Sequence, residues 1–423
     1  MSELSYLEKL LDGVEVEWLP LSKVFNLRNG YTPSKTKKEF WANGDIPWFR
    51  MDDIRENGRI LGNSLQKISS CAVKGGKLFP ENSILISTSA TIGEHALITV
   101  PHLANQRFTC LALKESYADC FDIKFLFYYC FSLAEWCQKN TTMSSFASVD
   151  MDGFKKFLIP RPCPDNPEKS LAIQSEIVRI LDTFSALTAE LTAELNMRKK
   201  QYNYYRDQLL SFKEGEVEWK TLGDVTKKWY SGGTPTAGKI EYYENGNIPW
   251  LRTQEVKFSE IDSTEIKITQ AALKNSSAKW IPRNCVIIAI SGATAGRSAI
   301  NKIPLTTNQH CGCLEIDDTK ALYRYVFHWV SFNYENIKSL GQGARGDLNS
   351  TIIKNFKLPI PHASDPQKSL KEQARIVEIL DKFDTLTNSI TEGLPREIEL
   401  RQKQYEYYRD LLFSFPKPET VSN

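Results

Sequence analysis

Apolar residues recur at alternating four- and three-residue spacings in the middle of the chain, at Ile173, Ile177, Ile180, Phe184, Leu187 and Leu191. This spacing is typical of the seam of a coiled-coil helix. The stripe continues through Leu195, Tyr202, Tyr205, Leu209 and Phe212. The pattern therefore predicts one long helix whose apolar stripe packs against a partner.

The same stripe returns near the C-terminus. The segment KQYNYYRDQL at residues 200–209 has a close copy, KQYEYYRDLL, at residues 403–412. The second helical region carries four extra residues before this motif, and an insertion of about one turn preserves the apolar face. Pro395, just after Gly393, predicts a kink or a local break. We expect the two long helices to pair with each other as an antiparallel coiled coil.

A wider duplication covers the chain at offsets of 199 to 203 residues. The segment VEWLPLSKV at residues 16–24 returns as VEWKTLGDV at 217–225, and NGYTPSKTKKEFWANGDIPWFR at 29–50 returns as SGGTPTAGKIEYYENGNIPWLR at 231–252. The patterns ATIG, Asn-Gln and FLIP of the first half return as ATAG, Asn-Gln and FKLP. The chain is therefore a tandem repeat with pseudo-twofold potential.

Each half begins with short segments of β character punctuated by Gly and Pro. The runs at 84–87, 107–113, 286–291 and 311–316 predict strands, and aromatic-rich helices are expected at about 122–138 and 322–339. Proline-rich connectors at 159–167 and 358–366 are interpreted as stiff hinges before the long helices. The fold class is α+β: two globular domains joined by two long helices.

Composition and charge add few constraints. The 423 residues are 41% hydrophobic and 25% charged, with a net charge of +2, as in an ordinary globular protein. Residues 28–77 hold ten Lys or Arg against five Asp or Glu, and residues 227–283 hold nine against six. Two basic segments at corresponding places indicate an anionic partner, although a solvated surface explains them equally well.

No targeting or membrane segment is evident, so we expect a cytoplasmic protein without membrane contact. The N-terminus has acidic residues and no long apolar run, and the densest apolar stretch, at residues 125–131, is too short to cross a bilayer. The nine cysteines lack the spacing of a metal site, so buried neutral thiols are expected.

Catalytic motifs are missing from the sequence. It contains no phosphate-binding GxxxxGK[ST], no GxGxxG after a strand and no HExxH, and none of the five histidines has a counterpart in the other half. We therefore expect neither a catalytic nor a metal site.

The duplicated features are polar loops. Hydroxyls and exposed backbone NH groups suit phosphate oxygens, whereas Arg, Asn and Gln suit base edges. The candidates are Thr32, Ser34, Lys35, Arg50, Ser89, Thr91, Asn105, Gln106 and Arg107 in the first half and Thr234, Thr236, Lys239, Arg252, Thr294, Arg297, Asn308 and Gln309 in the second. The Asn-Gln pairs could instead tie down a turn, and Trp48 and Trp250 are interpreted as core anchors rather than stacking platforms.

Tyrosine clusters mark both long helices. Tyr205 and Tyr408 follow the seam, which favours packing, whereas Tyr204 and Tyr407 point elsewhere. Long helices with apolar side chains beyond their seam suit helices of another subunit. We predict all four tyrosines as partner-binding residues.

Taken in order, these motifs closely resemble the specificity subunit of type I restriction-modification systems over the full length. The resemblance depends on the duplicated GYTPS…IPWFR and GGTPT…IPWLR segments, the SATIG and GATAG loops and the KQY-x-YYRD helices. It implies target recognition domains at residues 1–162 and 214–362, each reading half of a split double-stranded DNA sequence. Residues 163–213 and 363–423 would hold the spacer helices and a C-terminal tail.

The resemblance also implies which partners do the chemistry. Two methyltransferase subunits would dock on the helices and methylate adenine N6 after base flipping. Motor-nuclease subunits would add translocation and cleavage, so S-adenosylmethionine, ATP and magnesium would belong to the partners and no cofactor to this chain. Two alternatives stay open: a duplicated protein-binding scaffold without DNA recognition, and a carbohydrate-binding protein that uses the aromatic residues.

Overall fold

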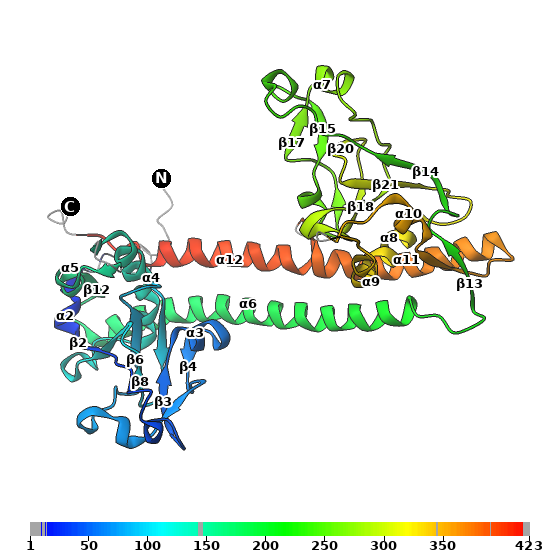
Figure 1. Cartoon of the computed structure of the whole chain (residues 1–423). Coiled ribbons are helices and arrows are strands. Elements are labelled where there is room, and N and C mark those ends of the chain that lie inside the picture. The colour runs from blue at the N-terminus through cyan, green and yellow to red at the C-terminus, as the bar shows by residue number, and fades with distance from the viewer. Residues whose placement is uncertain are drawn as a thin grey trace. The chain divides into compact units, whose positions relative to one another are not determined.

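The computed structural model describes residues 10, 13, 15–142, 147–343, 346–389 and 391–417. The chain divides into two compact units, described separately here. The first unit comprises Met1–Glu190 and Ile398–Asn423, and the second comprises Leu191–Glu397. Each contains a globule of strands and short helices, which Figure 1 labels by element. We refer to residues 15–162 as the first globule and to residues 217–361 as the second globule.

The first globule is built on a five-stranded sheet in the order β2-β9-β6-β7-β4. Neighbouring strands are antiparallel except β4 and β7, which are parallel. The globule also contains a three-stranded sheet in the order β5-β3-β8 and a two-stranded sheet in which β1 pairs with β12. The strands are β1 Val16–Pro20, β2 Phe25–Asn29, β3 Ile46–Phe49, β4 Ile60–Leu61, β5 Lys67–Ile68, β6 Ser83–Ser87, β7 His95–Ile98, β8 Leu103–Ala104, β9 Phe108–Leu113 and β12 Leu158–Pro162.

The second globule repeats these three sheets, whereas the small pair of β10 Thr141–Thr142 and β11 Ser148–Val149 belongs to the first globule. The sheets of the second globule are β14-β21-β18-β19-β16, β17-β15-β20 and the pair β13-β22. The strands are β13 Val217–Thr221, β14 Thr226–Ser231, β15 Ile248–Leu251, β16 Glu260–Ile261, β17 Ile266–Ile268, β18 Val286–Ala289, β19 Ser298–Asn301, β20 Thr306–Thr307, β21 Cys311–Ile316 and β22 Lys357–Pro361. All four apolar runs predicted as strands are confirmed, and so is the internal duplication.

Short helices complete the two globules, and one of the two predicted aromatic helices is interrupted. The predicted helix at 122–138 is α4, Ile123–Lys139, whereas the one at 322–339 divides into α8, Tyr323–Phe332, and α9, Tyr334–Ser339. The interruption is at Asn333, whose backbone NH and side-chain amide both donate to the carbonyl of Trp329 at 3.0 Å. The remaining short helices are α2 Leu21–Val24, α3 Met51–Asn57, α5 Met151–Lys156, α7 Gln270–Lys274 and α10 Ser350–Asn355.

Both long helical segments start at an Asx-Pro pair. Helix α6 spans Pro167–Leu209 and α11 spans Pro366–Asn388. The side chains of Asn166 and Asp365 accept from backbone NH groups of the first turn, at 3.0 and 3.1 Å. Proline fits the first helical position, where no intrahelical donor is required.

The proline-rich connectors are not the hinges that the sequence predicted. Their first residues form β12 and β22, each paired along five residues with the first strand of its globule. Two turns into each helix a buried glutamine is fixed to the globule: the Gln174 amide oxygen accepts from Asp122 N at 2.9 Å, and that of Gln373 accepts from Leu322 N at 2.9 Å. Because a paired strand precedes each helix and a buried glutamine fixes its first turns, each junction is part of the globule.

The C-terminal helical region is broken rather than merely kinked. Helix α11 ends at Asn388, and α12 spans Gly393–Leu412. Gly393 has φ of +80°, a left-handed conformation that favours glycine. Pro395 therefore lies in the first turn of α12, where it removes no hydrogen bond. Ile390, a residue of the predicted stripe, lies outside the described residues.

Each globule is completed by the end of a long helix, which is distant in sequence in the first globule and directly precedes the second. In the first unit Tyr405, Leu412, Phe413 and Phe415 belong to the apolar core, with Phe413 5.3 Å from Phe125 between ring centres. In the second unit Leu210 is buried in the core, and Tyr202, Leu209 and Phe212 pack against it. Phe184 stacks on Tyr408 within the first unit, and Phe383 stacks on Tyr205 within the second. A coiled coil over the full length of the helices stays a prediction.

The residues expected to be buried are confirmed except for two cysteines. Trp48 and Trp250 are 3% and 5% exposed, and each indole NH donates to a backbone carbonyl, Tyr31 O at 3.0 Å and Gly233 O at 3.1 Å. Seven of the nine cysteines are buried, Cys120 is half-buried and Cys71 is exposed. Burial raises the pKa of Cys285 and Cys311 to about 12, so these thiols stay neutral.

Candidate nucleic-acid interface

The duplicated polar motifs of the first globule meet where two loops approach each other. Thr32 donates its hydroxyl to the side-chain oxygen of Gln106. The Asn105 side-chain oxygen accepts from the backbone NH of Arg107 at 3.0 Å, which fixes the turn before β9. Gly30 makes the approach possible, because a Cβ there would lie 2.1 Å from the carbonyl oxygen of Asn105. The two motifs therefore form one site.

The second globule holds the same arrangement. Thr234 donates to the side-chain oxygen of Gln309 at 2.6 Å, and the Asn308 side-chain oxygen accepts from His310 N at 3.1 Å. A Cβ at Gly232 would lie 1.8 Å from the carbonyl oxygen of Thr307. Asn105 and Asn308 thus tie down turns, the alternative that the sequence left open, and the turns present Gln106 and Gln309 at the surface.

A hollow of about 820 Å³ opens beside these loops in the first globule. Six of the predicted residues line it: Thr32, Lys35, Arg50, Asn105, Gln106 and Arg107. The sequence interpretation missed Lys38, Trp41 and Gln66, which line it too. Lys38 belongs to the same TKK run as Lys37, so charge alone could have identified it, whereas Gln66 arrives from β5 without a local signal.

The backbone NH of the arginine after each IPW segment binds an acidic side chain three residues later. The NH of Arg50 donates to Asp53 Oδ2 at 2.6 Å, and the NH of Arg252 donates to Glu255 Oε2 at 3.0 Å. The other carboxylate oxygen of Asp53 accepts from Leu65 N at 2.6 Å, as that of Glu255 does from Glu265 N at 2.8 Å. Asp53 and Glu255 therefore link the end of the strand to the following loop. This link fixes the backbone from which each arginine side chain extends.

Three predicted residues of the first globule lie outside the hollow. Ser34 is exposed and shares a hydrogen bond of 2.8 Å with the Thr36 hydroxyl. Ser89 and Thr91 lie in the β6–β7 loop, and the Thr91 hydroxyl is buried without a hydrogen-bond partner. The loop meets the site through its backbone, because Thr88 N donates to the carbonyl of Arg107 at 2.9 Å.

Four predicted residues of the second globule are also separate from the Thr234–Gln309 pair. Thr236 and Lys239 are exposed before the short turn Ile240–Tyr242, and Lys239 Nζ lies 3.3 Å from the Tyr242 hydroxyl. Thr294 and Arg297 lie between β18 and β19, where the Arg297 carbonyl accepts from Ala289 N at 2.9 Å. The structure thus brings together fewer residues than the sequence predicted.

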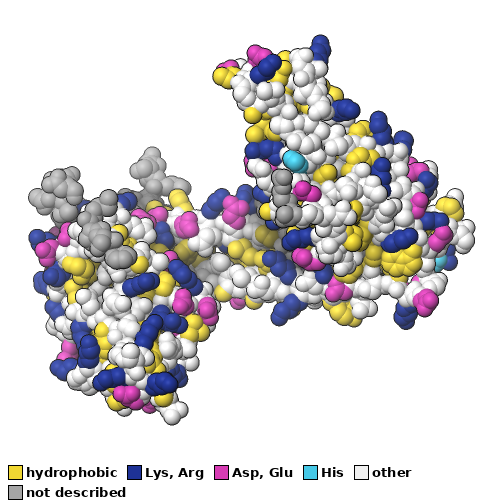
Figure 2. Space-filling view, viewed as in Figure 1, with side chains coloured by type: hydrophobic (Ala, Val, Ile, Leu, Met, Phe, Trp, Pro, Cys, Tyr) yellow, Lys and Arg dark blue, Asp and Glu magenta, His cyan; other side chains and the backbone are white. Residues whose placement is uncertain are grey.

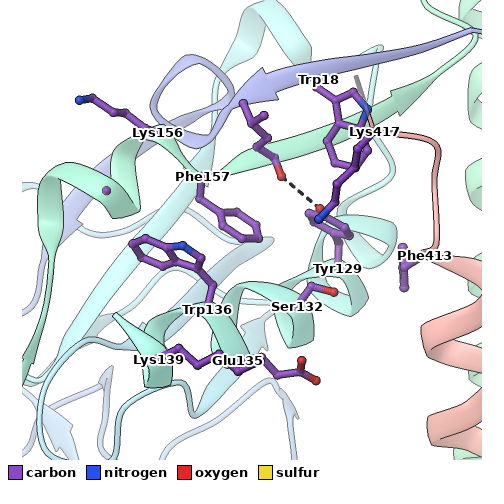
Figure 3. Close-up of a pocket in the computed structure, with 12 residues that line it drawn as sticks. Trp18, Tyr129, Ser132, Glu135, Trp136, Lys139, Lys156, Phe157, Phe413 and Lys417 are labelled. Atoms are coloured by element: carbon purple, nitrogen blue, oxygen red, sulfur yellow. Dashed lines mark hydrogen bonds between the residues drawn. The ribbon is translucent and has the colours of Figure 1, made fainter. Parts of the chain in front are cut away.

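A second hollow of about 570 Å³ in the first globule is lined by residues of α4. Figure 3 shows Trp136, Phe157 and Tyr129 around the same space. The Tyr129 hydroxyl donates to the Leu158 carbonyl at 3.1 Å, and burial raises its pKa, so it stays protonated. Trp18 donates its indole NH to the carbonyl of Pro416 at 2.9 Å. The hollow is where the C-terminal segment joins the globule, since Phe413 and Lys417 line it.

The helix tyrosines separate as their positions predicted. Tyr205 and Tyr408 stack on phenylalanines of their own units, whereas Tyr204 and Tyr407 are 62% and 65% exposed. Tyr204 and Tyr407 therefore remain available for another protein, and the partner-binding role of all four stays a prediction.

Comparison with known proteins places this architecture in a family. The model of the "Type I restriction modification DNA specificity domain" matches residues 13–198 and again residues 214–400. The chain belongs to this specificity-domain family. It is 64% identical over 398 residues to the specificity subunit of the type I restriction enzyme EcoprrI of Escherichia coli, covering 93% of both chains. It is 46% identical over 447 residues to the EcoR124I/EcoR124II specificity subunit of Escherichia coli, covering all of both.

Solved structures agree on the fold of the specificity-domain family. The S subunit of a type I restriction-modification system from M. genitalium superposes with a TM-score of 0.58 at 15% identity, over 96% of this chain and 98% of that one. Across the described ranges, no helix is long and apolar enough to cross a membrane. No group of three or more His, Cys, Asp and Glu is placed to hold a metal in the same part of the chain.

Proposed function

We propose that this chain is the DNA sequence-recognition subunit of a type I restriction-modification complex and that it carries no catalytic site. Each globule reads one half of a bipartite double-stranded DNA target. The observation that supports this most is the pair of matching loop sites, Thr32–Gln106 and Thr234–Gln309, which present polar side chains from the same scaffold with different neighbours. Two readers of one design suit two different half-sites.

The roles of the seventeen predicted DNA-binding residues belong to this proposal. The exposed Gln106, Arg107 and Gln309 are suited to base edges or phosphates, since their side chains face solvent at fixed turns. The division into recognition domains at 1–162 and 214–362, with spacer helices at 163–213 and 363–423, is proposed with it. The helices set the distance between half-sites and pair as an antiparallel coiled coil.

The chemistry of the complex is assigned to partners. Two methyltransferase subunits dock on the helices near Tyr204 and Tyr407, and motor-nuclease subunits join through them. S-adenosylmethionine, ATP and magnesium bind to those subunits, and the complex acts in the cytoplasm. The high exposure of both tyrosines supports the docking surface.

An exchange of residues 29–150 for the same region of another specificity subunit tests the reading function. The chimaera is assembled with its methyltransferase partner, and methylated adenines are mapped genome-wide. We expect one half of the bipartite site to change and the other to persist. Retention of both half-sites would reject the first globule as a reader, and an absence of salt-sensitive DNA binding would favour the protein-scaffold alternative.

A further inference from the structure

The hollow of the first globule is lined by four cations, Lys35, Lys38, Arg50 and Arg107. No carboxylate is among the residues that line it. Within the described parts of the chain, Lys35, Lys38 and Arg107 have no ion pair, and Arg50 has a single distant one, 3.7 Å from the exposed Asp52. Figure 2 shows many Lys and Arg side chains over the visible face of the first globule. Positive charge here is left uncompensated by the protein.

The equivalent positions of the second globule follow from its matching geometry. The single-turn helix after each TP motif starts at Lys38 in one globule and at Ile240 in the other. Three residues earlier, Lys35 corresponds to Ala237. The residue whose NH binds the turn asparagine is Arg107 in one and His310 in the other. Three of the four cations are therefore missing.

The fourth cation is present in both globules but is neutralised in the second. Arg252 Nη2 lies 2.6 Å from Glu265 Oε2, and its Nε lies 3.8 Å from Glu255. Glu265 occupies the position of Leu65, because both residues donate their NH to the acid that follows the arginine. At the same lining positions the first globule therefore has four positive charges, whereas the second has one that an acid compensates.

We propose that the two readers bind their half-sites by different physical means, an inference that rests on the proposed function. The first domain holds DNA mainly through phosphate neutralisation by Lys35, Lys38, Arg50 and Arg107. At the equivalent positions the second relies on uncharged contacts. Each phosphate contact by a cation contributes about 0.9 to the slope of log K against log salt concentration. The salt dependence of the whole complex is therefore dominated by the first domain.

Exchange of the two sets of residues tests this asymmetry. One variant carries Lys35→Ala and Lys38→Ile, the residues of the second globule, and the reciprocal variant carries Ala237→Lys and Ile240→Lys. The control, Lys155→Ala with Lys156→Ala, removes two exposed lysines on α5, outside the hollow that the four cations line. Each is assembled with methyltransferase subunits, and its affinity for a labelled mixed-sequence duplex is measured at several salt concentrations.

We expect the first variant to lower the slope by about 1.8, since two contacts of about 0.9 are lost. The reciprocal variant should raise it by a similar amount, and the control should leave it unchanged. An unchanged slope in the first variant, or an equal fall in the control, would overturn the proposed asymmetry. If the unmodified complex showed no salt-dependent binding, the proposed function itself would fail. Circular dichroism on each variant verifies folding.

Discussion

Acid should destabilise the first unit more than the second, because two neutral histidines are buried in its globule. His95 and His102 are both 0% exposed, and each donates through Nδ1, to Gly93 O at 3.0 Å and Val100 O at 2.8 Å. Aromatic rings enclose them, Phe131 at 4.5 Å from His95 and Phe79 at 5.5 Å from His102 between centres. The second globule has Ser298 and Leu305 at these positions.

Burial is the main cause that lowers both pKa values. The pKa of His95 falls to about 3, with Arg59 and Arg409 lowering it further and the Gly93 hydrogen bond opposing. The pKa of His102 falls to about 4. In the unfolded chain the pKa of both histidines would be about 6.5. The unfolded state therefore binds more protons below that pH, and stability is lost as the pH falls from about 6.5 toward the folded values.

At pH 5 each histidine lowers the free energy of unfolding by about 2 kcal/mol. The unfolded pKa lies about 1.5 units above pH 5, and each unit corresponds to about 1.4 kcal/mol. The assay is urea unfolding of the full chain at pH 7.5 and pH 5, followed separately for each unit. His102→Leu, which copies Leu305 of the second globule, should remove about half of the loss. An equal loss in the variant and the unmodified protein would refute the reasoning.

Three further predictions concern the spacer, the loop site and the docking surface. Deleting Thr192–Leu195, one of two tandem TAEL units, shortens α6 by about 6 Å and should shorten the spacer between methylated half-sites; an unchanged spacer would mean that the helices do not set it. Gly30→Ala should lower the urea midpoint of the first unit by the equivalent of about 1–3 kcal/mol because Cβ overlaps the Asn105 carbonyl, whereas Gly238→Ala, with no atom within 4 Å of its Cβ, should have no effect. Tyr204→Ala should weaken methyltransferase binding by at least about tenfold without changing the unfolding midpoint; equal binding in a titration would contradict the docking role.

Most of the architecture could be predicted from the sequence, because the same pattern occurs in both halves of the duplication. Apolar runs marked the buried strands, and β21 begins and ends at the predicted residues Cys311 and Ile316. The helix interruption at Asn333 was missed, because the apolar spacing continues across it.

The site was only partly predictable, for a geometric reason. Local motifs identified Thr32 and Gln106, but their hydrogen bond joins residues 74 positions apart, and no spacing rule reveals that they meet. Gln66 reaches the hollow because β5 pairs with β3. The neutralisation of Arg252 depends on Glu265 taking the place of Leu65, which becomes visible only when the two loops are compared in three dimensions.

The completion of the first core by Tyr405, Leu412, Phe413 and Phe415 has a consequence for the order of events during synthesis. A ribosome releases the first globule long before these side chains exist, whereas the second globule receives Leu210 before its own strands are made. The residues of the second core have all been made once Leu380 is added, whereas the first core waits with part of its apolar surface uncovered until Phe415 is made. A chain that stops before residue 405 would expose that surface permanently, which offers quality-control proteases a direct means of removing incomplete readers.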